Sequence, residues 1–153
     1  MKISGSHVVP VPRARAYELL QDPEVLGKCI PGADRLNRTG EGEYEMAMKV
    51  GMASISGQFA GKVRIADPDP PQSFRLLVEG TGKIGFVKGE GLLNLAPQGE
   101  SSTEVKYDGE VQVGGTIAAV GQRLIDTTSK MIIKKFFDKL AEEATASASP
   151  AAG

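Results

Sequence analysis

The sequence contains a single cysteine, Cys29, and a single histidine, His7. One cysteine excludes an internal disulfide and suits a reducing cytoplasm. One histidine and one cysteine cannot assemble a zinc site from the usual nitrogen and sulfur ligands. A nucleophile–base pair built on histidine would have to use His7, which we interpret as an exposed residue of an edge strand rather than a catalytic base. We therefore expect no metal, no cofactor and no catalytic residue.

An excess of one charge and long apolar runs are also missing. The formal net charge is -1, so no basic field attracts nucleic acid or an anionic membrane. No apolar run approaches the ~18 residues that a membrane span needs, and residues 1–5 show no signal-peptide pattern. The 153 residues, 41% hydrophobic and 24% charged, fit one globular domain. We expect a cytoplasmic protein.

Apolar and polar residues alternate from Ala33 to Val113. This alternation predicts antiparallel strands with one buried and one solvated face. Turn residues divide the segment into six strands, and residues 2–9 predict a seventh. The residues expected on the buried face include Tyr44, Met46, Met48, Phe59, Val63, Phe74, Leu76, Val78 and Tyr107.

Glycines are abundant on the expected buried face. The chain has 19 glycines, but Gly80–Lys83 and Gly89–Gly91 miss the spacing of phosphate-binding and dinucleotide-binding loops. Glycine in a strand indicates a bend or a close approach. The inward glycines Gly57, Gly61, Gly89, Gly91 and Gly109 therefore indicate either a sharply curved sheet alone or a sheet that also encloses an apolar ligand cavity.

Helical periodicity is expected in three places. Two short helices follow the first strand, over residues 13–21 and from Pro23 to about Leu26. A long helix is predicted from Thr116, as its cap, to about Ala144. Because no other long helix exists, it must cover the buried face of the sheet, which gives an α+β fold with a bent sheet around one helix. This single domain is expected over residues 1–144, with a disordered Ala/Ser/Pro tail over 145–153.

Short motifs follow one another along residues 2–142. They are Asp22–Leu26, Lys28–Ala33, Met48–Gly51, Gly57–Val63, Asp69–Pro71, Gly80–Gly82, Gly85–Gly89, Val113–Gly115, Gly121–Ile125 and Phe136–Phe137. Their succession resembles the family of the carbon monoxide dehydrogenase G-subunit. That family is a branch of the SRPBCC superfamily, which has the START-like helix-grip fold.

The resemblance implies an accessory role rather than an enzyme. It implies a helper of aerobic molybdenum-type carbon monoxide dehydrogenase that binds a hydrophobic small molecule, such as an isoprenoid quinone or lipid, or recruits the enzyme to the membrane. Partners would then be dehydrogenase subunits and, as an alternative to a purely cytoplasmic position, the inner face of the membrane. Two other functions stay open: an assembly or docking protein whose core is filled, and a cavity enzyme of the same fold.

A ligand cavity would be walled by inward residues of the sheet and the long helix. A buried phenol needs a hydrogen-bond partner, which Thr128 or a ligand carbonyl would supply to Tyr44 or Tyr107. Each expected wall residue is alternatively plain core. The expected set is Tyr44, Met46, Met48, Phe59, Phe74, Phe86, Tyr107, Gly121, Leu124, Thr128 and Met131.

Two further segments have competing interpretations. The turn Cys29, Ile30, Pro31 and Gly32 is expected at the rim of the pocket, although Cys29 suits a small buried packing role better than a reactive thiol. Near the end of the long helix, Phe136 and Phe137 are expected to contact a partner or a membrane surface. The alternative is that they cover the end of the sheet while the neighbouring lysines stay solvated.

Overall fold

The computed structural model describes residues 1–33, 36–52 and 55–151, and its strands form one antiparallel sheet. The strands are β1 (Lys2–Val9), β2 (Asn37–Gly40), β3 (Glu43–Met52), β4 (Ile55–Asp69), β5 (Ser73–Gly82), β6 (Gly85–Pro97) and β7 (Thr103–Gly114). Their order in the sheet is β1-β7-β6-β5-β4-β3-β2, which makes β1 an edge strand as expected. The predicted seven-stranded antiparallel sheet is confirmed.

Alternation along the strands fixes which face of the sheet is buried. In β5, Phe74 is fully buried, while its neighbour Arg75 forms an ion pair with Glu90 of β6 at 3.5 Å. Further along β5, Glu79 pairs with Lys88 of β6 at 3.8 Å. Because side chains point to opposite faces in turn, these pairs define the outer face, and Phe74 defines the face toward the helices.

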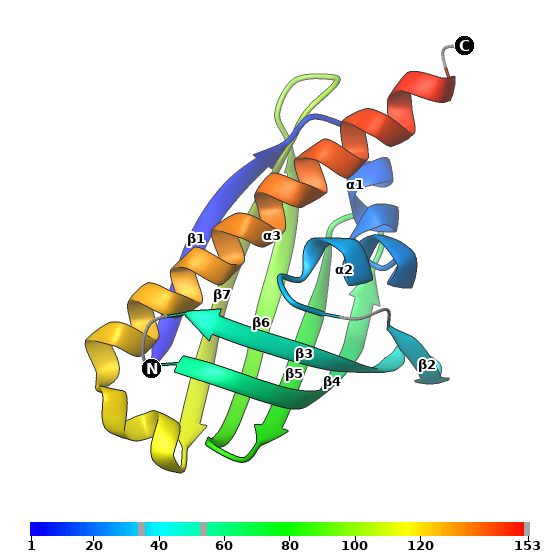
Figure 1. The fold of residues 1–153 in the computed structure, drawn as a ribbon. Helices are drawn as coiled ribbons and strands as arrows, with labels where there is room; N and C mark the ends of the chain where they lie inside the picture. The colour runs from blue at the N-terminus through cyan, green and yellow to red at the C-terminus, as the bar shows by residue number, and fades with distance from the viewer. Residues whose placement is uncertain (34–35, 53–54, 152–153) are drawn as a thin grey trace.

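Four helical segments complete the fold: α1 (Arg13–Leu19), α2 (Pro23–Cys29), the 3₁₀ segment η1 (Thr116–Val120) and α3 (Gln122–Ala151). Asp22 caps α2, because its carboxylate accepts a hydrogen bond from the Glu24 N–H at 2.9 Å. Figure 1 shows α3 crossing the concave face of the bent sheet, with α1 and α2 beside its C-terminal half.

The long helix differs from the sequence expectation at both ends. Thr116 does not cap it. Instead η1 lies between Gly115 and Gly121, whose φ angles of 81° and 98° are left-handed, and α3 begins only at Gln122. Glycine adopts such angles without steric cost, so these two residues break the helical path. At the other end α3 continues past Ala144, where we expected it to end; the disorder of residues 145–153 in solution stays a prediction.

Among the described residues, the apolar core consists of three clusters. The largest lies where α1 and the second half of α3 meet β1 and β7, around Leu19, Val105 and Leu140. A second joins α2 to β3 and β4, and includes Leu26, Tyr44, Met46 and Val63. A small third cluster contains Phe59 and Ile117, with Ile84, Val87, Val113 and Val120 packed against it. Residues of all three clusters line one cavity.

Candidate functional site

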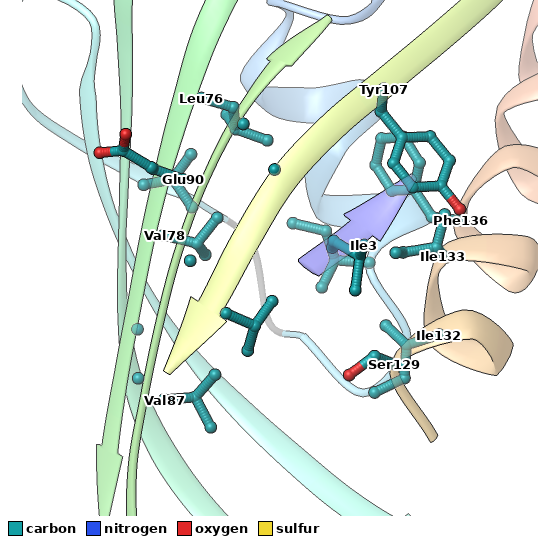
Figure 2. Close-up of a pocket in the computed structure, with 18 of the residues that line it drawn as sticks. Ile3, Leu76, Val78, Val87, Glu90, Tyr107, Ser129, Ile132, Ile133 and Phe136 are labelled. Carbon is teal, nitrogen blue, oxygen red and sulfur yellow. The ribbon is translucent and has the colours of Figure 1, made fainter. Parts of the chain in front are cut away.

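A cavity of about 390 Å³ lies between the concave face of the sheet and α3. Ligand pockets of proteins span about 300–1,000 Å³ and have mostly apolar walls. Figure 2 shows Ile132, Ile133 and Phe136 on the α3 side of the cavity and Leu76, Val78 and Val87 on the sheet side. The α2 region adds Leu26, Ile30 and Pro31.

Glycines make room for the cavity on the sheet side. Gly61, Gly89, Gly91 and Gly109 all line it. Gly91 and Gly109 face each other across β6 and β7, and a Cβ added at Gly109 would collide with the carbonyl oxygen of Glu90. A Cβ added at Gly89 would meet nothing closer than the Glu110 carbonyl oxygen at 3.7 Å. Gly109 is thus required by close strand packing, whereas a Cβ at Gly89 would have only ordinary van der Waals contacts.

Charged side chains contribute almost nothing to the interior of the cavity. Within the described ranges no lysine, arginine or histidine belongs to its wall, and four acidic residues do: Glu79, Glu90, Asp108 and Glu110. These four are exposed. Figure 2 shows the Glu90 carboxylate directed away from the cavity, toward its ion pair with Arg75. The acidic residues are therefore part of the wall, but their charged carboxylates lie outside the cavity.

Three hydroxyl groups are the polar uncharged side chains of the wall: Tyr107 on β7, and Thr128 and Ser129 on α3. Burial raises the pKa of the Tyr107 phenol, and the nearby Lys130 opposes this rise. The phenol stays neutral at physiological pH, as an unperturbed tyrosine also does. The described part of the wall therefore offers neutral hydrogen-bonding groups and an apolar surface, and no acid–base pair.

Most of the expected site residues lie in the cavity wall. These are Met46, Met48, Phe59, Phe74, Tyr107 and Thr128 from the expected wall, and Ile30 and Pro31 from the expected rim. Tyr44 and Leu124 are not part of the wall. Tyr44 is buried in the cluster around Leu26, which makes it plain core. Neither Tyr44 nor Tyr107 forms the hydrogen bond with Thr128 that we considered, within the part of the chain that the structure describes.

Phe86, Met131 and Gly121 are exposed, contrary to expectation. Phe86 is 41% exposed because the odd-numbered residues of β6, such as Val87 and Gly89, face inward and put Phe86 on the outer face. Met131 is 43% exposed. Gly121 precedes α3, and an added Cβ there would meet nothing within 4 Å. The helical stripe we drew through η1 and α3 was wrong, because the two segments are not one helix.

Two residues of the expected rim turn, Cys29 and Gly32, lie outside the cavity wall. Cys29 is buried in the main core at the end of α2 rather than at the cavity, so its small packing role is confirmed. Burial, with the charge of Glu143 adding to it, raises the pKa of the Cys29 thiol to about 11. Gly32 also lies outside the wall. It has a φ of 76°, and its carbonyl oxygen accepts a hydrogen bond from the Lys49 N–H at 2.9 Å, which ties the turn to β3.

The two phenylalanines of α3 face the sheet. Phe137 is buried and stacks on His7 with ring centroids 4.4 Å apart, while Phe136 is partly buried and meets Phe137 edge to face at 5.2 Å. Both line the cavity. This packing matches the alternative interpretation, in which the two phenylalanines cover the sheet. His7 is also partly buried rather than exposed, and desolvation lowers its pKa.

Several wall residues were missing from the expected set. They include Ile3, Val87, Leu93, Ile125, Ser129, Ile132 and Ile133. Val87 and Leu93 could have been found by continuing the inward register of β6 from Gly89 and Gly91 in both directions, whereas Ile3 lies in β1, opposite Gly109 of β7. The helix residues follow the spacing of three and four that is typical of a buried helical face, once α3 is started at Gln122.

No group of three or more His, Cys, Asp or Glu residues in the described ranges could hold a metal ion. None of the described helices combines the length and the hydropathy needed to cross a bilayer.

Solved structures of other proteins share this fold. A conserved protein from Geobacillus kaustophilus is 33% identical, with a TM-score of 0.93 over 96% of this chain and 97% of that chain. A START superfamily protein from Mycobacterium smegmatis is 16% identical, with a TM-score of 0.68 over 95% and 97%. The Zhui aromatase/cyclase from Streptomyces sp. R1128 is 13% identical, with a TM-score of 0.67 over 95% and 93%. The last two similarities concern the fold alone.

Residues 5–145 match the family described as the G-subunit of carbon monoxide dehydrogenase (CoxG). No curated protein matches the chain. The family match covers nearly all of the segment from which the resemblance was predicted, so that prediction is confirmed, and so is the START-like helix-grip fold.

Proposed function

We propose that this chain, which belongs to the CoxG family of carbon monoxide dehydrogenase, is an accessory protein that carries a hydrophobic small molecule. The observation that supports this proposal is the cavity of about 390 Å³, whose side chains are apolar apart from three hydroxyls and four outward acidic residues. A packed core leaves few voids larger than a water molecule. A cavity of this size inside a well-formed sheet and helix therefore has a use other than packing.

An isoprenoid quinone is the ligand we propose. At ~30 Å³ for each water-sized group, a cavity of about 390 Å³ holds about 13 non-hydrogen atoms. That size suits a quinone ring with its first isoprene unit, and the rest of a long tail would leave the cavity. A quinone is an electron acceptor that a soluble dehydrogenase cannot easily draw from a bilayer, so a carrier would supply it.

Binding fits the wall better than catalysis does. Some proteins of this fold are enzymes, as the name of the aromatase/cyclase states. Acid–base catalysis needs a titratable group within hydrogen-bond reach of the substrate. The described wall offers only the hydroxyls of Tyr107, Thr128 and Ser129, because its acidic residues are exposed at the outside. An accessory role without chemistry of its own is therefore the function we favour.

Thermal unfolding of delipidated protein tests ligand binding. A ligand that binds only the folded state stabilises it by ~2.7 kcal/mol at a concentration 100 times its dissociation constant. We expect short-tailed quinones to raise the Tm, and organic extraction of the freshly purified protein to release a lipophile that mass spectrometry can identify. An absence of any Tm shift across quinones, alkanols and alkanes would favour the alternative function, a docking protein whose core is filled.

Partner and membrane contacts are the other half of the proposal. We propose that the loaded protein meets dehydrogenase subunits and, peripherally, the membrane from which the quinone comes. A reconstituted mixture of dehydrogenase, quinone-containing vesicles and this protein should reduce quinone faster with the protein than without it. Equal rates in both mixtures would exclude the delivery role, and vesicle flotation of the protein alone would test the membrane contact separately.

A further inference from the structure

Thr128 differs from the other threonines of α3. Thr127 donates a hydrogen bond from its hydroxyl to the Arg123 carbonyl oxygen at 3.0 Å, and Thr145 donates one to Ala141 at 2.9 Å. Bonds of this kind to the carbonyl four residues back are the usual way in which a helix satisfies a threonine. Thr128 makes no such bond, and within the described chain its hydroxyl has no protein partner. Yet Thr128 is only 8% exposed, and it lines the cavity.

An unpartnered hydroxyl at a buried position requires a hydrogen-bond partner inside the cavity. Buried polar groups in proteins are almost always hydrogen-bonded, to protein or to water. Among the described residues, no side-chain nitrogen or oxygen that is completely enclosed lacks a partner, so the Thr128 hydroxyl is open to the cavity rather than sealed in the core. Thr128 lies between Ile125 and Ile132 along the face of α3 that lines the cavity. Apart from the adjacent Ser129, its surroundings on that face are apolar.

The residues of the wall also limit the charge of a ligand group that binds the Thr128 hydroxyl. A carboxylate inside an apolar cavity is strongly disfavoured unless a cation or several donors compensate it. No lysine, arginine or histidine of the described ranges is part of the wall, and the charged residues that are part of it are acidic. An anionic group at Thr128 would thus have no cationic residue of the described wall as its counter-charge.

We propose that Thr128 anchors an uncharged ligand, with a carbonyl or hydroxyl oxygen accepting the hydrogen bond of the Thr128 Oγ1–H. The ligand class is a neutral lipophile with an oxygen acceptor at its buried end, and fatty acids in their ionised form are excluded. This inference rests on the proposed function, since it names the chemistry of the same cavity. Thr128 acts here as the residue that sets ligand specificity.

The experiment compares four probes that differ only at one end: 2-dodecanone, 1-dodecanol, dodecane and dodecanoic acid. Each has about 12 to 14 non-hydrogen atoms, about the number that the cavity holds. Affinity is obtained from the rise in Tm with probe concentration. The variants are Thr128→Val, which keeps the shape without the hydroxyl, Thr128→Ser, which keeps the hydroxyl, and Thr127→Val, a matched control whose hydroxyl is bonded within the helix.

We expect Thr128→Val to lose about fivefold to tenfold in affinity for the ketone and the alcohol, which corresponds to one net hydrogen bond. Affinity for dodecane should stay the same or rise. Thr128→Ser and Thr127→Val should bind the ketone like the wild type. Dodecanoic acid should bind only when protonated, so its affinity should fall about 100-fold from about pH 5.5 to 7.5, because each unit above the carboxyl pKa removes about nine-tenths of the neutral form. Dodecanol does not titrate, so its affinity at the two pH values controls for effects of pH on the protein itself.

Two results would overturn the inference and leave the proposed function intact. One is a Thr128→Val protein that binds all neutral probes with wild-type affinity. The other is dodecanoic acid that binds equally well at both pH values, which would place the carboxylate in solvent at an opening. If instead none of the four probes binds the wild type, the cavity takes no ligand, and the proposed function fails together with this inference.

Discussion

Filling the cavity from the sheet side provides the sharpest test of where a ligand lies. Gly89 lines the cavity, and a Cβ added there would have its nearest neighbour at 3.7 Å, an ordinary contact distance. Gly89→Leu introduces four carbon atoms. At ~30 Å³ for each group of that size, it removes about 120 Å³, nearly a third of the 390 Å³.

The lost volume converts into an expected loss of affinity. A probe of about 13 non-hydrogen atoms would have to leave about four of them outside the cavity. At ~0.8 kcal/mol for each CH₂ group no longer buried, the loss is about 3 kcal/mol, or roughly 200-fold in the dissociation constant. An eight-carbon ketone leaves enough unused space to tolerate the new side chain, so its affinity should change little. The protein itself should be as stable as the wild type or more so, because glycine weakens a strand.

Thermal unfolding with 2-dodecanone and 2-octanone measures all of these quantities at once. Lys88→Leu is the matched control. It adds an apolar side chain at the neighbouring position, but on the outer face, where Lys88 pairs with Glu79 at 3.8 Å. Wild-type affinity for the long ketone in Gly89→Leu would refute the assignment of the ligand to this cavity. A large loss in Lys88→Leu as well would show that the effect is not one of cavity volume.

Three other predictions follow from the same packing. Burial lowers the pKa of His7, so folding favours its neutral form, and the Tm should fall as pH drops below the unfolded value of ~6.5; His7→Phe should reduce this dependence in a pH series. With a pKa raised to about 11, the Cys29 thiol should resist a disulfide reagent at about pH 8 and react at a free-thiol rate only in denaturant. Phe137→Ser should cost ~3 kcal/mol or more of unfolding free energy in a urea titration; normal stability would place Phe137 on an exposed face.

The overall fold could be predicted because its determinants are local and repeated. Alternation over several residues identifies each strand, and a one-residue shift would turn the whole apolar set of a strand to solvent. The inward positions Met46, Phe59 and Phe74 were therefore found from sequence and lie in the cavity wall. Glycines on the inner face indicated either curvature or a cavity, and Gly89 and Gly109 both line the cavity: a Cβ would have ordinary contacts at Gly89 and would collide with the backbone of β6 at Gly109.

Some of the predicted positions in the long helix were wrong because a single residue changes the direction of the chain, and with it the face on which the later residues lie. Gly121 was counted as one more position on a helical stripe, whereas its left-handed φ of 98° separates η1 from α3. Positions predicted across such a break are rotated away from their true direction, which is how Met131 was placed inside. Phe86 was misplaced within a single regular strand. We expected it in the cavity wall, but the inward register of Gly89 and Gly91 in the same strand puts it on the opposite face.

Thr127 and Thr128 illustrate a property that the periodicity of a sequence does not predict, which is the hydrogen-bond partner of a side chain. Both are threonines of α3, and neighbouring residues of a helix are separated by about 100°. Thr127 faces outward and satisfies its hydroxyl on the Arg123 carbonyl, whereas Thr128 is buried at the cavity with no partner in the described chain. Sequence could assign Thr128 to the inner face, but whether its hydroxyl bonds back to the helix is a choice of side-chain rotamer. That choice decides whether the cavity presents a plain apolar wall to a ligand or a hydrogen-bond donor within it.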